Sequence, residues 1–316
     1  MATRSSTSGP SPGTGSPAVG PTAASVDDVV AALAAHDYLA DEGLATSIYL
    51  ALTLQRPLFL EGEAGVGKTE VAKTLARWLG AELIRLQCYE GIDAAQAVYE
   101  WDYGRQLLHL RTVEARHDEV SEDELYSERF LVRRALLRAI DHGDGVPPVL
   151  LIDEVDRADD EFEAFLLEVL ADWAITVPEI GTLHAARPPI AILTSNRTRD
   201  VHDALKRRCL YHWIEHPDFD RELEIVRLRA PHVAAALAAD IAGAAAALRS
   251  LGLYKPPGIA ETIDWAEAVA ALGRDRLDEH TVDVTLGTVV KYREDQHRVR
   301  AHGLAALVEA ATAQTA

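Results

Sequence analysis

Short apolar segments alternate with helical patterns over the first two thirds of the chain. The helical pattern begins near Val26, and it returns at residues 128–143 and 160–173. Apolar, strand-like segments lie between and around these helices, at residues 56–61, 81–88, 147–159, 188–200 and 209–216. Strands that alternate with helices predict an α/β fold with a mainly parallel sheet and helices on both of its faces.

The pattern changes after His216, where no further strand is expected. Apolar residues then recur at helical spacing in residues 220–230, 232–252, 259–273 and 279–304. The first 24 residues are mostly Ser, Thr, Gly and Pro, a composition that cannot bury enough apolar surface to order itself. We therefore predict a disordered tail at residues 1–24, an α/β core at residues 25–216 and a smaller, all-helical domain at residues 217–316.

The turn between the first strand and the following helix reads "GEAGVGKT", residues 62–69. It matches the pattern G-x-x-x-x-G-K-[ST] in the strand-to-helix context that a phosphate-binding loop requires. Glycines let backbone N–H groups turn inward around an anion, and the helix N-terminus adds its positive dipole end. The predicted nucleotide-binding residues are Gly62, Glu63, Ala64, Gly65, Val66, Gly67, Lys68, Thr69 and Glu70, with Lys68 on the β- and γ-phosphates and the Thr69 hydroxyl on Mg²⁺.

Polar residues end two later strands, and they supply candidates for hydrolysis. Asp153 and Glu154 close the apolar segment "VLLIDE", and Asn196 closes "ILTSN". Ligands bind at the carboxyl edge of such a sheet. We expect Asp153 to hold Mg²⁺ directly or through a water, Glu154 to orient and polarise the attacking water, and the Asn196 amide to hydrogen-bond that water or the γ-phosphate. Phosphoryl transfer needs this kind of positioning and charge neutralisation more than covalent chemistry.

The overall charge and composition restrict the partners. The formal net charge is −19, which disfavours a general binder of phosphate backbones, so we expect protein partners rather than nucleic acid. Cys88 and Cys209 are far apart and read as two buried, reduced thiols. Because the sequence has no apolar run long enough to span a membrane and no secretory signal, we expect a cytoplasmic protein.

The motifs "GEAGVGKT", "VLLIDEVD", "LTSN" and "LKRRC", followed by a helical tail, resemble those of an AAA+ ATPase. More narrowly, the chain from Val26 onward resembles the MoxR group, in the branch often encoded beside carbon monoxide dehydrogenase and other molybdenum hydroxylases. The resemblance implies a ring-forming chaperone ATPase, most simply a hexamer, that uses ATP and Mg²⁺. It also implies a partner with a von Willebrand factor A domain and a client enzyme complex whose cofactor insertion or maturation it assists.

The resemblance further implies an arginine finger that reaches the neighbouring subunit's nucleotide. Arg207 and Arg208 precede the fifth strand, and we choose Arg208 because it directly precedes that strand, with Arg207 as the alternative. Relatives also often carry an arginine early in a lid helix. The corresponding stretch here, "YKPPGIAETIDWAEA", has Lys255 but no arginine, so either Lys255 substitutes imperfectly or the contact is missing.

Two further segments have a functional and a plain structural interpretation. Residues 172–189 predict a β-hairpin that either projects toward a substrate or neighbour or is an ordinary surface hairpin. Tyr99, Trp101 and Tyr103 alternate, so in an extended loop they would point the same way and could contact a client. The alternative is that these aromatic residues pack on their own domain.

Other functional classes remain as alternatives. A P-loop kinase, or a switch that binds ATP without remodelling activity, would share the loop, although a pure binder has no need of Glu154. A GTPase would need an N-K-x-D motif, which the sequence lacks. A DNA-acting AAA+ loader is disfavoured by the charge.

Overall fold

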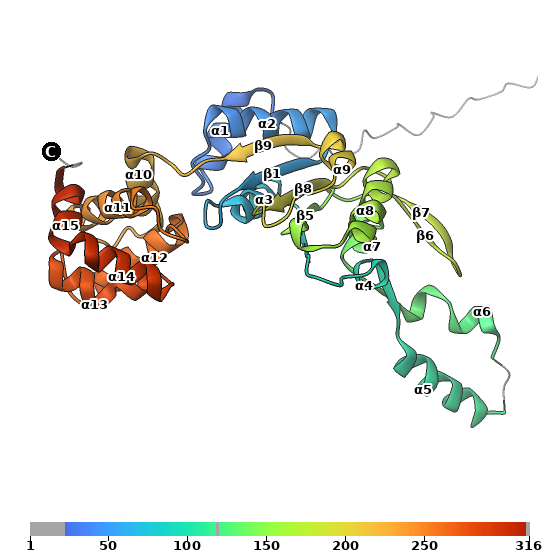
Figure 1. Ribbon diagram of the computed structural model, residues 1–316. Coiled ribbons are helices and arrows are strands. Elements are labelled where there is room, and N and C mark those ends of the chain that lie inside the picture. Colours follow the sequence, from blue (N-terminus) through green and yellow to red (C-terminus); the bar gives the residue numbers. More distant parts are fainter. Residues whose placement is uncertain (1–22, 118–119, 314–316) are drawn as a thin grey trace, which may run out of the picture.

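A computed structural model describes residues 23–117 and 120–313 of the chain (Figure 1). Its centre is a five-stranded parallel sheet with the order β2-β5-β8-β1-β9. The strands are β1 (Leu58–Gly62), β2 (Leu83–Gln87), β5 (Val149–Asp153), β8 (Ile190–Ser195) and β9 (Leu210–Ile214). Each overlaps the segment predicted for it, so the predicted α/β fold is confirmed.

Helices cover both faces of this sheet because successive strand residues point to opposite sides. Leu58 and Leu60 of β1 pack in one buried cluster with three helices, whereas Phe59 belongs to the cluster on the other face. The first face carries α1 (Val26–Ala34), α2 (Glu42–Leu54) and α3 (Lys68–Leu79). The second carries α7 (Ala135–Ile140), α8 (Asp160–Asp172) and α9 (Asp203–Arg208), with 3-10 turns at Glu128–Phe130 and Val155–Arg157 nearby.

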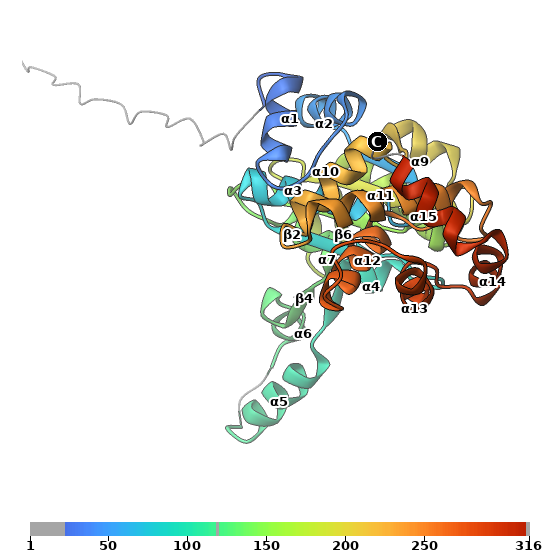
Figure 2. The same cartoon turned by 90° about the vertical axis from the view of Figure 1, so that its left-hand side faces the viewer.

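The chain segment that connects β2 to β5 forms an arm that extends away from the rest of the molecule (Figures 1 and 2). It contains α5 (Tyr103–Glu114) and α6 (Glu122–Leu125), and it is rooted by α4 (Ala94–Val98) and by the antiparallel pair β3 (Tyr99–Trp101) and β4 (Leu131–Arg133). We predicted one helix across residues 128–143, and that prediction is wrong for its first half. Pairing of β4 with β3 overrides the local helical pattern there.

The arm also decides between the two interpretations of the aromatic segment. Trp101 is only 5% exposed and packs edge-on against Tyr126 at 5.2 Å between ring centroids, while Tyr99 is half-buried. Tyr103 begins α5 and is exposed. The extended loop of three aligned aromatic residues is therefore wrong, and two of them pack on their own domain. The predicted hairpin at residues 172–189 is present as β6 (Ala174–Val177) paired with β7 (Gly181–His184).

The C-terminal region is helical and has its own core, in which Trp265 is fully buried and donates to Thr285 Oγ1 at 2.8 Å. It lies to one side of the sheet (Figure 1). Its helices are α10 (Phe219–Arg229), α11 (Ala235–Ser250), α12 (Ile259–Ala271), α13 (Glu279–Val289), α14 (Arg293–His302) and α15 (Leu304–Ala313). None of the helices between residues 23 and 313 is long and apolar enough to cross a membrane.

The predicted tail, residues 1–24, lies outside the described residues except for Ala23 and Ala24. Cys88 and Cys209 are both buried free thiols, as expected, and burial raises the pKa of each to about 12.

Candidate active site

The glycine-rich loop leads directly into α3. Gly67 is the residue before the first helical turn, and its φ of 94° lies in the left-handed region that glycine tolerates best. Lys68 folds back over the loop and donates from Nζ to the carbonyl oxygens of Gly62 at 2.8 Å and Glu63 at 2.6 Å. The sequence thus forms the compact strand–loop–helix turn that its glycines predicted.

The Lys68 ammonium lies in a poorly solvated position. Burial lowers its pKa to about 8, against the opposing pull of Asp156, Asp153, Glu154 and Glu63. Desolvation therefore outweighs the attraction of four nearby carboxylates. Nζ donates to neutral backbone carbonyls and not to a carboxylate. A phosphate bound beside it would therefore be the first negative charge in direct contact with the ammonium.

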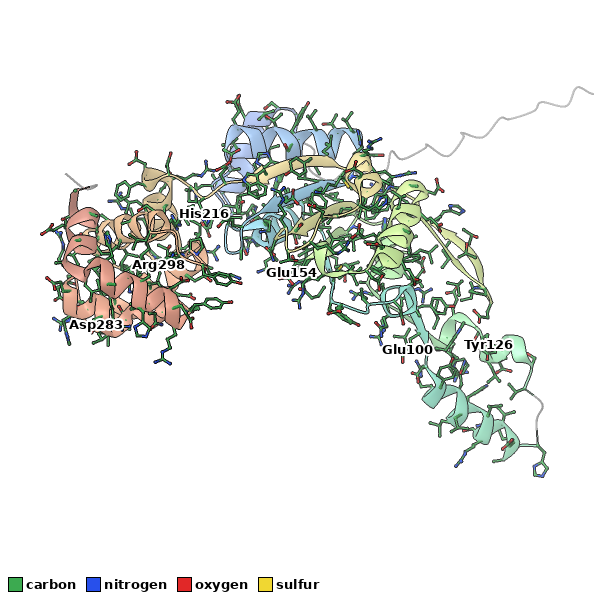
Figure 3. All side chains as sticks on the ribbon, in the orientation of Figure 1. Glu100, Tyr126, Glu154, His216, Asp283 and Arg298 are labelled. Atoms are coloured by element: carbon green, nitrogen blue, oxygen red, sulfur yellow. The ribbon has the colours of Figure 1, made fainter. Side chains whose placement is uncertain are left out.

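Residues Ala64 to Glu70 line one cavity of about 550 Å³, together with Asp153, Glu154 and Asn196. Gly62 and Glu63, which we predicted as nucleotide contacts, do not line it, and they instead accept the two hydrogen bonds from Lys68. Glu154 lies on the side of the core that faces the helical region, as Figure 3 shows. The chain segments that the sequence singled out thus converge on one space.

Asp153 lines this cavity and is buried, with 2% of the residue exposed. Its Oδ1 accepts from Thr69 Oγ1 at 3.0 Å and from Thr194 Oγ1 at 2.5 Å. The phosphate loop and the end of β5 therefore meet at one carboxylate oxygen, as expected if Thr69 and Asp153 share a metal ion. The same Thr194 oxygen accepts from the Glu154 backbone N–H at 2.9 Å.

Glu154 adopts an unusual backbone conformation, with φ at 55°. Left-handed conformations in non-glycine residues cost of the order of 1 kcal/mol and cluster at functional sites. The turn directs the side chain toward Asn196, whose Nδ2 donates to Glu154 Oε1 at 3.4 Å. The order of the strands explains this contact, because β8 lies between the loop strand β1 and the acidic strand β5.

Asp156 fixes the segment that carries Asn196. It is 2% exposed, and its carboxylate accepts from the backbone N–H of Asn196 at 3.3 Å and from the N–H and hydroxyl of Thr198 at 2.8 and 2.7 Å. A buried carboxylate that is hydrogen-bonded in this way holds its donors in place. The position of Asn196 is therefore set from the turn that follows Glu154.

The helical region contributes one wall of the cavity. The N–H of Ile259, at the start of α12, donates to the Gly65 carbonyl at 3.0 Å. A Cβ on Gly258 would come within 2.7 Å of Gly65 Cα, so only glycine permits this approach. Lys255 is exposed and does not line the cavity, and its backbone N–H is bound to Asp295. The possibility that Lys255 replaces the lid arginine is therefore wrong for this conformation.

Two arginines of α10 line the cavity instead. Arg221 donates from Nη2 to the Leu39 carbonyl at 2.6 Å, and Arg229 lies 3.6 Å from Glu70. Burial opposes ionisation of Glu70, but hydrogen bonds from Arg77 and Lys73 and the charge of Arg229 lower its pKa overall. The helical region thus brings positive charge to the cavity from α10 rather than from the start of α12.

The two finger candidates lie elsewhere. Arg207 and Arg208 end α9 and are both exposed, and neither lines the cavity of its own chain. Arg207 forms a loose ion pair with Asp203, at 3.7 Å. Arg56 binds the end of this helix by donating to the carbonyl oxygens of Arg207 and Arg208 at 3.0 Å each.

The residues present fit Mg²⁺ held with a nucleotide. Magnesium sites with phosphate ligands commonly use one or two oxygen groups of the protein, and here the Thr69 hydroxyl and the Asp153 carboxylate already touch. Within residues 23–117 and 120–313, no group of three or more His, Cys, Asp or Glu side chains could hold a metal by itself. Phosphate oxygens would have to complete such a site.

Several polar residues of this site were not identified from the sequence. Asp156 and Thr194 lie within the motifs "VLLIDEVD" and "LTSN" without an assigned role, and Arg221 and Arg229 gave no signal beyond ordinary polarity. Arg85 and Gln87 did give one, because they alternate with Ile84 and Leu86 along β2 and must point away from the buried face. Arg85 donates to Asp153, and Gln87 donates to Glu154.

Residues 57–209 match the family model of the AAA domain (dynein-related subfamily). No curated protein matches the sequence. Solved structures similar to this one include the RuvB Holliday junction branch migration motor of Thermotoga maritima, at 18% identity over 85% of this chain and 71% of that chain, with a TM-score of 0.46.

A mutant form of the same RuvB is similar at 17% identity over 85% of this chain and 72% of that chain, with a TM-score of 0.45. Likenesses of this size say nothing about what this chain acts on. The family match and the strand order are stronger evidence for the fold than these two likenesses. The chain has the fold of an AAA+ P-loop nucleoside triphosphatase, and the AAA domain model matches residues 57–209 of it.

Proposed function

We propose that this chain hydrolyses ATP to ADP and phosphate. A water oxygen attacks the γ-phosphorus while the bond to the β–γ bridging oxygen breaks, and Glu154 orients that water and accepts its proton. Lys68 holds the β- and γ-phosphates, and Asn196 hydrogen-bonds the water or the γ-phosphate. Thr69 and Asp153 would hold Mg²⁺, which would neutralise charge on the phosphates when bound.

The observation that carries this proposal is the meeting of three motifs at one cavity. The Thr69–Asp153 contact at 3.0 Å joins the phosphate loop to the acidic strand, and the Glu154–Asn196 contact at 3.4 Å joins that strand to its neighbour. A loop that only bound a nucleotide would not require a carboxylate in a strained turn that contacts Asn196 at the same cavity.

We further propose that the enzyme works as a MoxR-type chaperone in a ring, most simply a hexamer. Its proposed partners are a von Willebrand factor A domain protein and a client enzyme complex in the cytoplasm. The exposed positions of Arg207 and Arg208, away from their own cavity, support a finger that acts on a neighbour. We propose residues 1–24 as a tail, residues 25–216 as the core and residues 217–316 as the lid domain.

Steady-state hydrolysis with ATP and with GTP tests the proposed activity. Glu154→Gln should bind ATP with near-normal affinity and hydrolyse it at least about tenfold more slowly, a barrier increase of about 1.4 kcal/mol or more. Glu267→Gln is a matched control, because Glu267 is exposed on α12, and it should retain full activity. Unchanged turnover in Glu154→Gln would remove its assigned role.

The same variant tests the chaperone proposal. If Glu154→Gln holds ATP without hydrolysing it, the ring should retain its client. Identification of what co-purifies with it should yield an enzyme complex or a von Willebrand factor A domain protein. Recovery of nucleic acid in place of protein would favour a DNA-acting motor.

A further inference from the structure

The Asp153 carboxylate, which we assign to the metal, already binds a positively charged side chain. Arg85 of β2 donates to Asp153 Oδ2 twice, from Nε at 3.0 Å and from Nη2 at 2.5 Å. Neighbouring parallel strands cause this contact, because β2 and β5 run side by side with Gln87 opposite Asp153, and Arg85 points the same way as Gln87. None of the roles described so far uses this guanidinium.

All the acceptor capacity of Asp153 is therefore in use. Oδ2 accepts both bonds from Arg85, and Oδ1 accepts from Thr69 and Thr194. An ionised carboxylate offers about four lone-pair sites, so the four hydrogen bonds saturate it. A divalent cation that shares Asp153 with Thr69 must either compete with Arg85 or tolerate its charge at very short range.

The two partners differ sharply in their access to water. The Asp153 side chain is 4% exposed, whereas the Arg85 side chain is 51% exposed. Two cations beside one buried carboxylate repel each other with little screening. Arg85 can move into solvent, whereas Asp153 is buried and bonded to Thr69 and Thr194, so the arrangement favours displacement of Arg85.

The departure of Arg85 would also reach Glu154. The same Arg85 Nη2 donates to Gln87 Oε1 at 2.5 Å, and Gln87 Nε2 donates to Glu154 Oε2 at 3.1 Å. Arg85 thus connects the metal carboxylate to the amide that holds the water-orienting carboxylate. Without Arg85, Gln87 loses a contact that fixes its orientation.

We propose that Arg85 is a displaceable counterion of the metal site. It neutralises Asp153 and, through Gln87, restrains Glu154 while no metal is bound, and it moves into solvent when Mg²⁺ binds with the nucleotide. Glu154 then loses one of its restraints in the loaded site, while Arg157 Nη1 still donates to its Oε2 at 3.1 Å and Asn196 Nδ2 to its Oε1 at 3.4 Å. The inference rests on the proposed function, because it assumes that a nucleotide and Mg²⁺ bind at this cavity.

The competing interpretation is a permanent ion pair that positions Asp153 for the metal. The two interpretations predict opposite effects of removing Arg85 on the affinity for Mg²⁺. If Arg85 competes with Mg²⁺, its removal strengthens metal binding. If Arg85 is a support, its removal weakens metal binding because Asp153 loses its orientation.

The test is a Mg²⁺ titration of the full chain at a fixed, subsaturating concentration of a fluorescent ATP analogue, with binding as the readout. Arg85→Ala should lower the Mg²⁺ concentration at half-saturation by about tenfold, the size of a typical coupling between sites. Arg85→Lys, with a single ammonium that cannot span both partners, should give a smaller shift in the same direction. Arg138→Ala is the matched control, because this arginine pairs with Glu82 on the surface, and it should not change the titration.

Melting temperatures of all four proteins establish that the variants are folded. If Arg85→Ala is folded and its Mg²⁺ concentration at half-saturation is unchanged or higher, the proposal is overturned. Failure of the wild-type chain to bind the analogue at any Mg²⁺ concentration would instead refute the proposed function. The two failures are therefore distinguishable.

Discussion

At the scale of single residues, the most informative group is Lys68. Its ammonium donates to two backbone carbonyl oxygens rather than to a carboxylate. Burial lowers its pKa to about 8. A charge that is desolvated before the ligand arrives loses little further hydration on binding, so most of its attraction to phosphate remains available.

We therefore predict that Lys68→Met weakens ATP binding by at least about a hundredfold, equivalent to two lost charge-assisted hydrogen bonds. The melting temperature should stay close to that of the wild type, because the two lost bonds to carbonyls are offset by removal of a desolvated charge. Calorimetric titration with ATP and a thermal melt measure the two quantities. Near-normal affinity in a folded variant would refute the assignment of the loop.

The residues of this site differ in how far the sequence could identify them. Lys68, Thr69, Asp153, Glu154 and Asn196 each follow a motif or end a strand, and all five line one cavity. Arg85 could not be assigned, because its role depends on which strand pairs with β2. Sequence order places β2 and β5 far apart, and only the sheet makes them neighbours.

At the scale of elements, the root of the arm shows where local patterns failed. Residues 128–143 have helical periodicity, yet β4 forms there because its partner β3 offers a ladder of backbone hydrogen bonds. Trp101 belongs to this pair and is buried, although its acidic neighbours suggested exposure. A three-residue strand carries too little pattern to be predicted without its partner.

The burial of Trp101 determines what its substitution should do. We predict that Trp101→Ala destabilises the protein by about 3–5 kcal/mol, the usual cost of removing a buried aromatic side chain. Trp101→Phe should cost much less, because the indole Nε1 has no hydrogen-bond partner in the described residues and only volume is lost. Urea denaturation measures both values. A folded, fully stable Trp101→Ala that has lost only partner binding would restore the exposed interpretation.

The short helix α9 depends on a residue from outside it. Arg56 donates to the carbonyl oxygens of Arg207 and Arg208, at the end where a helix leaves its carbonyls without intrahelical partners. We predict that Arg56→Ala retains ATP binding but misplaces the proposed finger, Arg208. Turnover should then fall by roughly tenfold or more, as it does for small misplacements of a catalytic group. Arg56→Lys should recover part of the loss. Equal losses of ATP affinity and turnover would mean that Arg56 supports the core in general.

At the scale of the whole molecule, three contacts join the helical region to the core around the cavity. Ile259 binds Gly65, Arg221 binds the Leu39 carbonyl, and Arg229 lies beside Glu70. The core segments they reach are the phosphate loop, the stretch before α2 and the first turn of α3. A nucleotide in this cavity would contact both parts, so it would favour whichever arrangement of the two parts it binds more tightly.

Within a single chain, no arginine that lines the cavity is free to neutralise the charge that the proposed reaction develops, as far as the described residues show. Negative charge spreads over the γ-phosphoryl oxygens in the transition state, and an arginine that contacts them is worth orders of magnitude in rate. Arg221 and Arg229 line the cavity but are engaged with Leu39 and Glu70. Arg208 is exposed and outside its own cavity, so it could serve only a neighbouring chain.

The last prediction follows from that placement. If a second subunit completes each site, as we propose, specific activity should rise with protein concentration. Arg208→Ala should retain ATP binding and lose hydrolysis by at least about a thousandfold if it is the finger. Arg207→Ala, on the same exposed helix end, is the matched control and should remain active, and the reverse result would make Arg207 the finger.

Mixing two inactive variants separates action in trans from action within one chain. Arg208→Ala subunits keep Glu154, and Glu154→Gln subunits keep Arg208, so some interfaces in a mixed ring contain an intact Glu154 facing an intact Arg208. The activity of the mixture should therefore exceed that of either variant alone. If the rate of the wild type does not depend on concentration and the mixture stays inactive, both the finger and the ring are wrong, and the hydrolysing unit is a single chain.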